Sequence, residues 1–290
     1  MANNIQYSTV FLPLLDKVYK QDAKTSILEG DETTVQKGKN GEIKIAKLDM
    51  DALGDFSRSS GYTSGSTTLV WEAIKYDKER SQKLKIDRLD NDEAVVDAFA
   101  NLSSEFVRTK VIPETDAARI AKIAKTAIGA SNGKSEDLTT AAQVIAALRA
   151  STNAMDEAEV PVESRILFIT PTHRSLLDDM DTYKSKAVLD RFSDIIIVPQ
   201  SRMYTGVTLN SGKTKYGYEQ ETGSYAINFL VVEKSAAVCA MDQYIKYFSP
   251  DEDQEGDNHI LAYRNYNLYG YVYENKTAGV YCSYGKTAKS

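Results

Sequence analysis

Cysteine is scarce in this chain: 290 residues contain only Cys239 and Cys282. Two thiols are too few to cross-link a chain of this length into a disulfide framework. Both lie in apolar or aromatic sequence typical of strands, so we expect free thiols. Histidine is equally rare, and neither His173 nor His259 has neighbours at metal-ligand spacing. The sequence therefore predicts no metal site, and we expect His173 at the start of a helix.

Blocks of positive charge and long apolar runs are also absent. The 35 basic and 41 acidic residues are spread along the whole chain, and the net charge is -6. This excludes the basic stripe that binds nucleic acid by counterion release, and with it sequence-specific DNA binding. No apolar run reaches the roughly 18 residues of a membrane span, and the amino terminus lacks the features of a signal peptide. We expect a protein made in the cytoplasm that does not contact a membrane.

A nucleotide-binding motif is present only in incomplete form. The stretch "GVTLNSGKT", Gly206–Thr214, ends in the Gly-Lys-Thr of a phosphate loop, but five residues instead of four separate Gly206 from Gly212. The sequence that follows has two glycines and no helical stripe, so the helix whose amides would hold the phosphates is missing. We interpret the stretch as a polar hairpin loop and keep an NTP-binding enzyme as a distant alternative.

A second partial motif is "DEDQEGD", Asp251–Asp257, which resembles the start of a calcium loop with Gly256 at the sixth place. The twelfth place is Ala262, where a bidentate glutamate is needed. We therefore interpret the stretch as an acidic turn between strands. No nucleophile motif and no dinucleotide fingerprint occur either, so we expect no catalytic residues, no cofactor and no enzymatic activity.

The first ninety residues contain strands without a core of their own. Residues 1–48 combine a short apolar patch with a Gly-containing polar segment and the strand-like "EIKIAKL". Residues 49–90 then give two strand-like segments around a tip rich in Gly and Ser. The descending segment is rich in β-branched and aromatic residues but carries charges at many positions, so the subunit's own core cannot cover it. A long two-stranded excursion fits best.

A helical period begins near Asn91, with Asp92 as a plausible cap. Its apolar residues are spaced four, three and four apart: Val95, Phe99, Leu102 and Phe106. Pro113 is expected to kink or restart the helix, which then ends at Gly129. An element of more than thirty residues would be about 50 Å long at 1.5 Å per residue.

The rest of the chain mixes helices and strands. A further helix is indicated by an apolar stripe of Leu138, Ala141, Ile145 and Leu148. The short apolar runs "RILFITP" and "DIIIVPQ" predict strands, with a helix between them that begins after Thr170 with Pro171 at its first position. Residues 227–281 predict several more strands.

The order of these elements resembles the tailed-bacteriophage major capsid (coat) protein family, whose fold is shared by encapsulin shell proteins. The resemblance covers nearly the whole chain and rests on extended pattern. Its most specific parts are "KIAKLDMDALGDFSRSSGYTSGSTTLVWE" at 44–72, "FVRTKVIPETDAARIAKIA" at 106–124, "VPVESRILFITPTHRSLL" at 160–177, and the closing strands at 227–281.

The resemblance implies an α+β fold with five parts. They are an N-terminal arm (1–48), an extended two-stranded loop (49–90), a peripheral domain with a long spine helix (91–150), an axial α/β domain (151–235), and strands that complete the peripheral domain and return to the axial domain (236–290). The stretch Gly206–Thr214 falls in an axial-domain loop. An arm, an uncovered excursion and an overlong helix have one explanation if neighbouring subunits cover them.

The function implied is that of a structural protein of the virion. The chain would self-assemble as a homo-oligomer into hexamers and pentamers of an icosahedral shell around double-stranded DNA; the alternative within the fold is an encapsulin-type nanocompartment. Expected partners are other copies of the chain, a separate scaffolding protein, a portal protein at one vertex, and weakly bound DNA. Assembly is expected in the host bacterial cytoplasm. In the extended loop we expect Trp71 and Tyr76 to contact an adjacent subunit.

Overall fold

The structure, a computed structural model, describes residues 23–30, 35–37, 42–59, 61–88, 104–179, 183–253 and 256–290. The chain divides into two compact units, one formed by residues 1–29 with 79–290 and the other by residues 30–78. We call residues 30–78 the ribbon unit and the remainder the main unit. Helices and strands are both present, which confirms the α+β class.

The ribbon unit is a three-stranded antiparallel sheet in the order β1-β2-β3. The strands are β1 (Val35–Lys37), β2 (Glu42–Met50) and β3 (Thr67–Lys75). β2 and β3 pair along their full length, from Glu42 opposite Lys75 to Met50 opposite Thr67, and the Gly- and Ser-containing loop 51–66 joins them. A pair of strands around a tip is present, but its first strand is the predicted strand "EIKIAKL" and lies before residue 51.

The resemblance implies an extended loop at residues 49–90, and the ribbon unit overlaps it in part. The ribbon unit begins at Gly30 and ends at Lys78. The next strand, β4 (Lys78–Asp87), is hydrogen-bonded to β12 in a sheet of the main unit. Its half-buried positions alternate with exposed ones because only one of its faces is covered.

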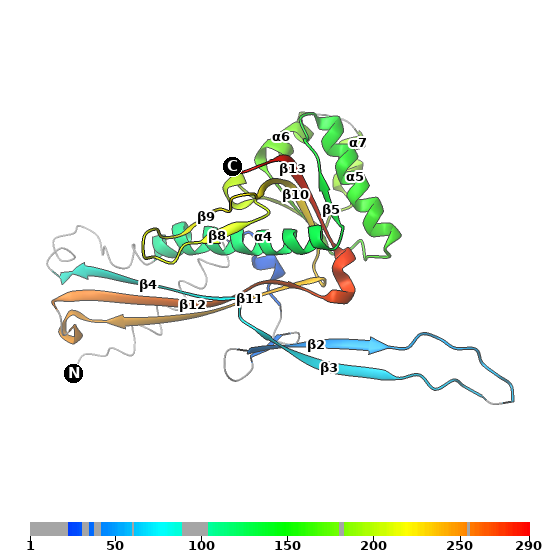
Figure 1. The fold of residues 1–290 in the computed structure, drawn as a ribbon, viewed down its shortest axis with the longest axis horizontal. Helices are drawn as coiled ribbons and strands as arrows, with labels where there is room; N and C mark the ends of the chain where they lie inside the picture. The colour runs from blue at the N-terminus through cyan, green and yellow to red at the C-terminus, as the bar shows by residue number, and fades with distance from the viewer. Residues whose placement is uncertain are drawn as a thin grey trace. The chain divides into compact units, whose positions relative to one another are not determined.

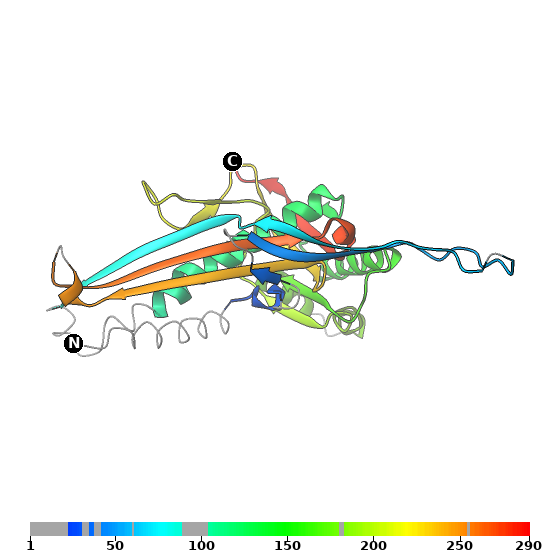
Figure 2. The same ribbon diagram turned by 90° about the horizontal axis from the view of Figure 1, so that it is seen from below.

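The main unit contains a long sheet with the order β11-β12-β4. β11 (Ala237–Phe248) and β12 (Asn258–Val272) form a long antiparallel pair, and β4 lies at the other side of β12 (Figures 1 and 2). A second, mixed sheet has the order β5-β13-β10-β6-β7. Its strands are β5 (Gly133–Ser135), β13 (Val280–Ala288), β10 (Tyr225–Glu233), β6 (Arg165–Ile169) and β7 (Asp194–Ile197).

Helix α4 (Ile112–Gly129) lies between the long sheet and the five-stranded sheet (Figure 1). The opposite face of the five-stranded sheet is covered by α5 (Ala141–Glu157), α6 (Pro171–Asp178) and α7 (Tyr183–Leu189). β6 is buried on both faces: Ile166 and Phe168 pack with α4, while Leu167 and Ile169 pack with the other helices. This explains its uninterrupted apolar sequence.

The chain is helical without a break from Ser104 to Gly129. A π-helical turn, η2 (Val107–Val111), stands immediately before α4, whose first turn contains Pro113. Proline lacks an N–H group and its ring displaces the preceding carbonyls, so a regular α-helix cannot continue through it. The predicted restart at Pro113 and the end at Gly129 are confirmed, whereas the predicted cap at Asp92 and first turns lie outside the described residues.

One glycine sets the distance between α4 and the long sheet. Gly270 in β12 has φ +102°, and a Cβ atom there would lie 2.7 Å from Cγ1 of Ile123. The register of β11 against β12 also shifts nearby, between Val238 and Ala240. Only glycine accepts both the backbone angle and the close contact.

The remaining elements agree with most local predictions. α6 begins after Thr170 with Pro171 in its first turn, as predicted. α5 begins at Ala141 with a capping box between Thr140 and Gln143, so Leu138 precedes the helix although it packs in the same core cluster. Shorter elements are β8 (Val207–Leu209), β9 (Tyr218–Gln220) and the 3-10 turns η1 (Ser26–Leu28), η3 (Gln200–Arg202), η4 (Pro250–Glu252) and η5 (Glu274–Gly279).

Candidate functional site

The ribbon unit presents large apolar side chains on both of its faces. Along β3, Leu69, Val70 and Trp71 are 58%, 52% and 40% exposed. Successive residues of a strand point to opposite faces, so none of the described residues covers either face of β3 at these positions. Tyr76, which follows β3, is half-buried. An uncovered apolar ribbon is a typical binding surface for a further polypeptide.

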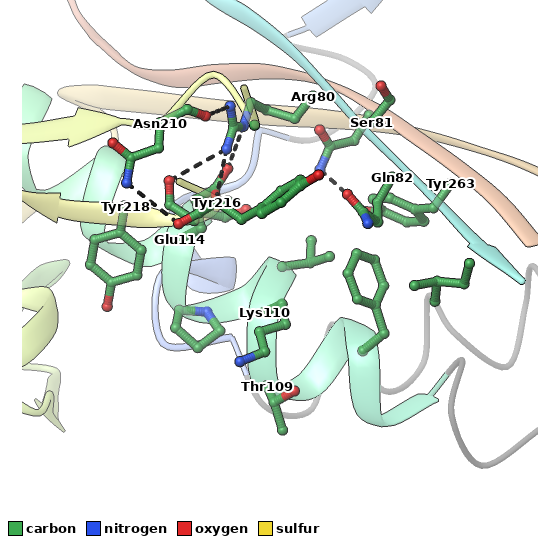
Figure 3. A pocket seen from close by; sticks show the side chains of 18 of the residues that line it. Arg80, Ser81, Gln82, Thr109, Lys110, Glu114, Asn210, Tyr216, Tyr218 and Tyr263 are labelled. Atoms are coloured by element: carbon green, nitrogen blue, oxygen red, sulfur yellow. Dashed lines mark hydrogen bonds and ion pairs between the residues drawn. The ribbon is translucent and has the colours of Figure 1, made fainter. Parts of the chain in front are cut away.

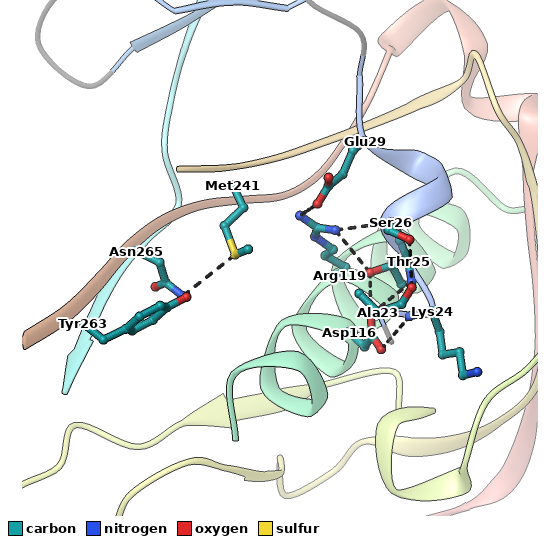
Figure 4. A network of polar contacts seen from close by, with 10 residues as sticks. All are labelled: Ala23, Lys24, Thr25, Ser26, Glu29, Asp116, Arg119, Met241, Tyr263 and Asn265. Atoms are coloured by element: carbon teal, nitrogen blue, oxygen red, sulfur yellow. Dashed lines mark hydrogen bonds and ion pairs between the residues drawn. The ribbon is translucent and has the colours of Figure 1, made fainter. Parts of the chain in front are cut away.

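The start of the described chain is fixed to α4 by a buried polar network (Figure 4). Its centre is Asp116, a carboxylate with no exposed surface. The hydroxyl of Thr25 donates to Asp116 at 2.6 Å, and the backbone N–H groups of Lys24 and Thr25 donate at 3.1 Å. Arg202 donates a further bond at 3.1 Å. The charge of Asp116 is thus balanced by a cation and three other donors, as burial of a carboxylate requires.

A second buried charge, Arg119, lies one turn further along α4. Its Nη2 atom is 2.9 Å from Oε1 of Glu29, and its Nη1 atom is 3.3 Å from the Thr25 hydroxyl. Glu29 also forms a parallel bridge with Cys239 at the start of β11. Residues 23–29 are therefore held between α4 and the long sheet.

A cavity of about 700 Å³ opens on the main unit between four segments (Figure 3). These segments are β4, the helical residues 106–115, the tip of the β8–β9 hairpin, and β12. Apolar and aromatic side chains form much of the wall, including Phe106, Pro113 and Tyr216. The volume lies within the range of about 300–1,000 Å³ that is common for ligand pockets.

Arg80 holds three of these segments together. Its Nε and Nη2 atoms donate to the two carboxylate oxygens of Glu114 at 2.6 and 3.1 Å, and Nη1 donates to the carbonyl of Asn210 at 2.6 Å (Figure 3). This bidentate bond to Glu114 raises the pKa of the Arg80 guanidinium, which stays charged. The β8–β9 tip is thereby tied to the first turn of α4.

The floor of the cavity is polar. The side-chain amide of Asn265 donates to the Tyr263 hydroxyl at 3.2 Å, and that hydroxyl donates to Gln243 at 3.2 Å. Burial raises the pKa of Tyr263, which therefore stays protonated. Oδ1 of Asn265 has no hydrogen-bond partner in the part of the chain that the structure describes. An unpaired buried acceptor costs free energy.

The glycine-rich stretch Gly206–Thr214 spans β8 and the tip of the β8–β9 hairpin. No helix follows it before β9, and the Gly212 N–H group donates to the carbonyl of Lys215 within the tip. The prediction of a hairpin loop is confirmed. The tip contacts Arg80, so it lies against the long sheet and α4 even though its sequence falls in the segment assigned to the axial domain.

The other motifs form no site. Asp251 and Asp257 of the acidic turn lie 3.6 and 3.7 Å from Arg88. The described residues contain no group of three or more His, Cys, Asp or Glu side chains that could hold a metal ion. His173 starts a helix as predicted but is buried, with Nδ1 2.5 Å from the Thr170 hydroxyl, and burial lowers its pKa. Both cysteines are buried and free, as expected.

Among the helices of the described residues, none is long and apolar enough to span a membrane. No protein-family model matches the sequence, and no curated protein matches it.

Solved structures do match. The capsid structure of the cyanophage P-SCSP1u is 15% identical with a TM-score of 0.54, covering 88% of this chain and 85% of that one. The mature capsid of bacteriophage PhiM1 is 12% identical with a TM-score of 0.54 and coverage of 87% and 84%. The virus-like particle from Pyrococcus furiosus is 9% identical with a TM-score of 0.53 and coverage of 96% and 99%. The chain has the fold that bacteriophage capsid proteins share with this virus-like particle.

Proposed function

We propose that the chain is the major capsid protein of a tailed bacteriophage and forms the hexamers and pentamers of an icosahedral shell around double-stranded DNA. The ribbon unit carries this proposal. A small sheet gains independent stability only when it packs an apolar face, yet Leu69, Val70 and Trp71 on the two faces of β3 are exposed. Such a ribbon gains stability when other copies of the chain cover it, as they would in a closed shell.

The parts of the chain take roles within this proposal. Residues 1–48 form the N-terminal arm, of which residues 23–29 are held at the network of Asp116 and Arg119. The ribbon unit lies across an adjacent subunit, with Trp71 and Tyr76 in the contact. α4 and the long sheet form the peripheral domain, and the five-stranded sheet with α5, α6 and α7 forms the axial domain. We propose a structural role and no catalytic one.

The proposed partners are other copies of the chain, a separate scaffolding protein, a portal protein at one vertex and the packaged DNA. The net charge of -6 supports weak, non-specific DNA contacts that weaken further with salt. The proposed location is the virion capsid, after assembly in the host bacterial cytoplasm. Tight, sequence-dependent binding of capsomers to duplex DNA at physiological salt would contradict this part.

Electron microscopy of the expressed protein tests the proposal. We expect capsomer rings or closed shells from the folded chain, and uniform shells when a scaffolding protein is co-expressed. Circular dichroism of the same sample controls for folding. A folded chain that sediments only as a monomer at every protein concentration and salt condition would overturn the proposal.

The second candidate is an encapsulin-type nanocompartment shell, which the match to the Pyrococcus furiosus particle supports. Purified particles distinguish the two: packaged DNA favours the phage capsid, and a packaged protein cargo without DNA favours the nanocompartment. The distant alternative, an NTP-binding enzyme, requires ATP binding at the β8–β9 tip. Equilibrium dialysis should detect no ATP binding; binding that Lys213→Ala abolishes would support the enzyme.

A further inference from the structure

The loop of the ribbon unit carries two exposed aromatic rings. Phe56 and Tyr62 are 60% and 91% exposed, and their rings pack edge to face with centroids 5.1 Å apart. We call this pair the aromatic knob. Leu53 beside it is completely exposed. Rings of this size contribute most to binding when another surface buries them.

The knob is held in shape by its own backbone. Ser57 and Gly61 exchange two hydrogen bonds, at 3.2 and 2.7 Å. At the base of the loop, the Asp51 N–H group donates to the carbonyl of Ser66 at 3.1 Å, and the Ser66 N–H group donates to the Asp51 carboxylate at 2.7 Å. A loop ordered before binding loses little conformational entropy when it binds. The knob is thus a preorganised contact element.

The cavity of the main unit matches the knob in size and in aromatic character. Its volume of about 700 Å³ has room for two aromatic side chains, and its wall offers the rings of Phe106 and Tyr216. Rings of the knob that enter the cavity would pack against these two rings.

The charges beside the knob and beside the cavity are of opposite sign. Asp55, which precedes Phe56, is exposed, and Lys110 on the cavity wall is exposed too. An acidic residue beside an aromatic knob and a basic residue beside an aromatic cavity favour one orientation of docking.

We infer that the aromatic knob of one copy of the chain inserts into the cavity of a second copy, with Asp55 beside Lys110. The inference rests on the proposed function, because it requires neighbouring copies in an assembly. To the proposed function it adds the surface on the second copy, the cavity of its main unit, that binds the loop of the ribbon unit.

Disulfide trapping between two chains tests the inference. One chain carries Asp55→Cys, and a second, of different length through a tag, carries Lys110→Cys; the two are co-assembled and oxidised with copper phenanthroline in air. Cys239 and Cys282 have no exposed surface and contribute little background. We expect a reducible band that contains both chains. The matched control replaces Lys110→Cys by Lys125→Cys, because Lys125 is exposed on α4 but outside this cavity.

Trapping no stronger than in the Lys125→Cys control would overturn the inference. So would efficient trapping within a single monomeric chain that carries both Asp55→Cys and Lys110→Cys, since the knob would then occupy its own cavity. Trapping of the cavity cysteine by a co-purified scaffolding protein instead of the knob would also contradict it.

Truncation of the knob supplies a second measurement. Phe56→Ala and Tyr62→Ala should each raise the protein concentration needed for half-maximal assembly by roughly tenfold or more. Tyr244→Ala, at an aromatic residue that is 51% exposed on the long sheet, should leave this concentration within about twofold. If the unaltered chain assembles and both knob variants match it, the inference fails alone; if the unaltered chain does not assemble, the proposed function fails.

Discussion

The hydroxyl of Thr25 donates a 2.6 Å hydrogen bond to the carboxylate of Asp116, and neither residue has exposed surface. These residues are 91 positions apart in the chain. The bond therefore fixes the beginning of the described chain to the middle helix of the main unit. Arg202 also donates to the Asp116 carboxylate, and Arg119 donates to the Thr25 hydroxyl.

Removal of the Thr25 hydroxyl should destabilise the subunit. Thr25→Val keeps the volume but deprives Asp116 of one donor and Arg119 of one acceptor, so we expect a loss of about 1–3 kcal/mol. Urea unfolding of unassembled subunits, followed by circular dichroism, measures it. Thr25→Ser keeps the hydroxyl and should cost clearly less; equal losses in the two variants would assign the effect to packing instead.

Gly270 should not tolerate a side chain. Gly270→Ala places a Cβ at 2.7 Å from Ile123 and forces φ +102° on an L-residue, which predicts a loss of about 1–3 kcal/mol of unfolding free energy. The control is Gly129→Ala at the end of α4, where a Cβ meets no atom within 4 Å and helix propensity favours alanine. A Gly270→Ala variant as stable as Gly129→Ala would show that β12 can move away from α4.

Local sequence signals predicted the elements whose boundaries depend on neighbouring residues. Pro113 and Gly129 mark the start and end of α4 because backbone chemistry alone restricts them. The same holds for Thr170 and Pro171 at α6. The uninterrupted apolar run of β6 also follows directly from burial on both faces.

Features that need distant partners could not be predicted in this way. The pairing of β4 with β12 is one such feature, because β12 begins only at Asn258 and the exposed charges of β4 do not indicate that Arg80 and Leu84 line a cavity. A signal for the buried network existed: Asp116 and Arg119 are charged residues three apart on a stripe of α4 that is otherwise apolar. Their partner Thr25 carries no such signal.

The stability of the main unit should fall as the pH drops below about 6.5. Burial lowers the pKa of His173 from its usual 6.5, so the folded state prefers the neutral ring, which is hydrogen-bonded to the Thr170 hydroxyl. The unfolded chain binds the proton first, and stability present above pH 6.5 is lost as the pH falls through that value.

The midpoint of thermal unfolding, measured between pH 8 and pH 5, should fall with pH in the unaltered chain. It should fall less in His173→Gln, because this variant lacks the titrating imidazole. Asp156 does not confound this window, because its hydrogen bond from Arg191 lowers a pKa that is normally 3.8. Identical pH profiles for the two proteins would show that His173 does not control the acid sensitivity.

Loss of Arg80 should loosen the β8–β9 tip. Arg80→Ala removes the donors to Glu114 and to the Asn210 carbonyl while leaving Glu114 partly buried, so trypsin should cleave after Lys213 or Lys215 several-fold faster. Arg88→Ala is the control, because Arg88 is 49% exposed and its acidic partners are at least 3.6 Å away. Unchanged cleavage in Arg80→Ala would mean that other contacts hold the tip.

Substitution of Trp71 in the ribbon unit should impair assembly while leaving the folding of the subunit nearly unchanged. Trp71 is 40% exposed, so Trp71→Ala should change the unfolding free energy of the isolated subunit by no more than about 0.5–1 kcal/mol. A tryptophan buried at an interface contributes about 2 kcal/mol or more, which corresponds to a rise of at least tenfold in the concentration needed for assembly. Sedimentation velocity and urea unfolding on the same preparation measure the two effects. Phe248→Ala, at an aromatic residue of the long sheet that is 38% exposed, is the matched control. Shells from Trp71→Ala at the yield and concentration of the unaltered chain would show that Trp71 faces solvent in the assembly, and the proposed subunit contact would then be wrong.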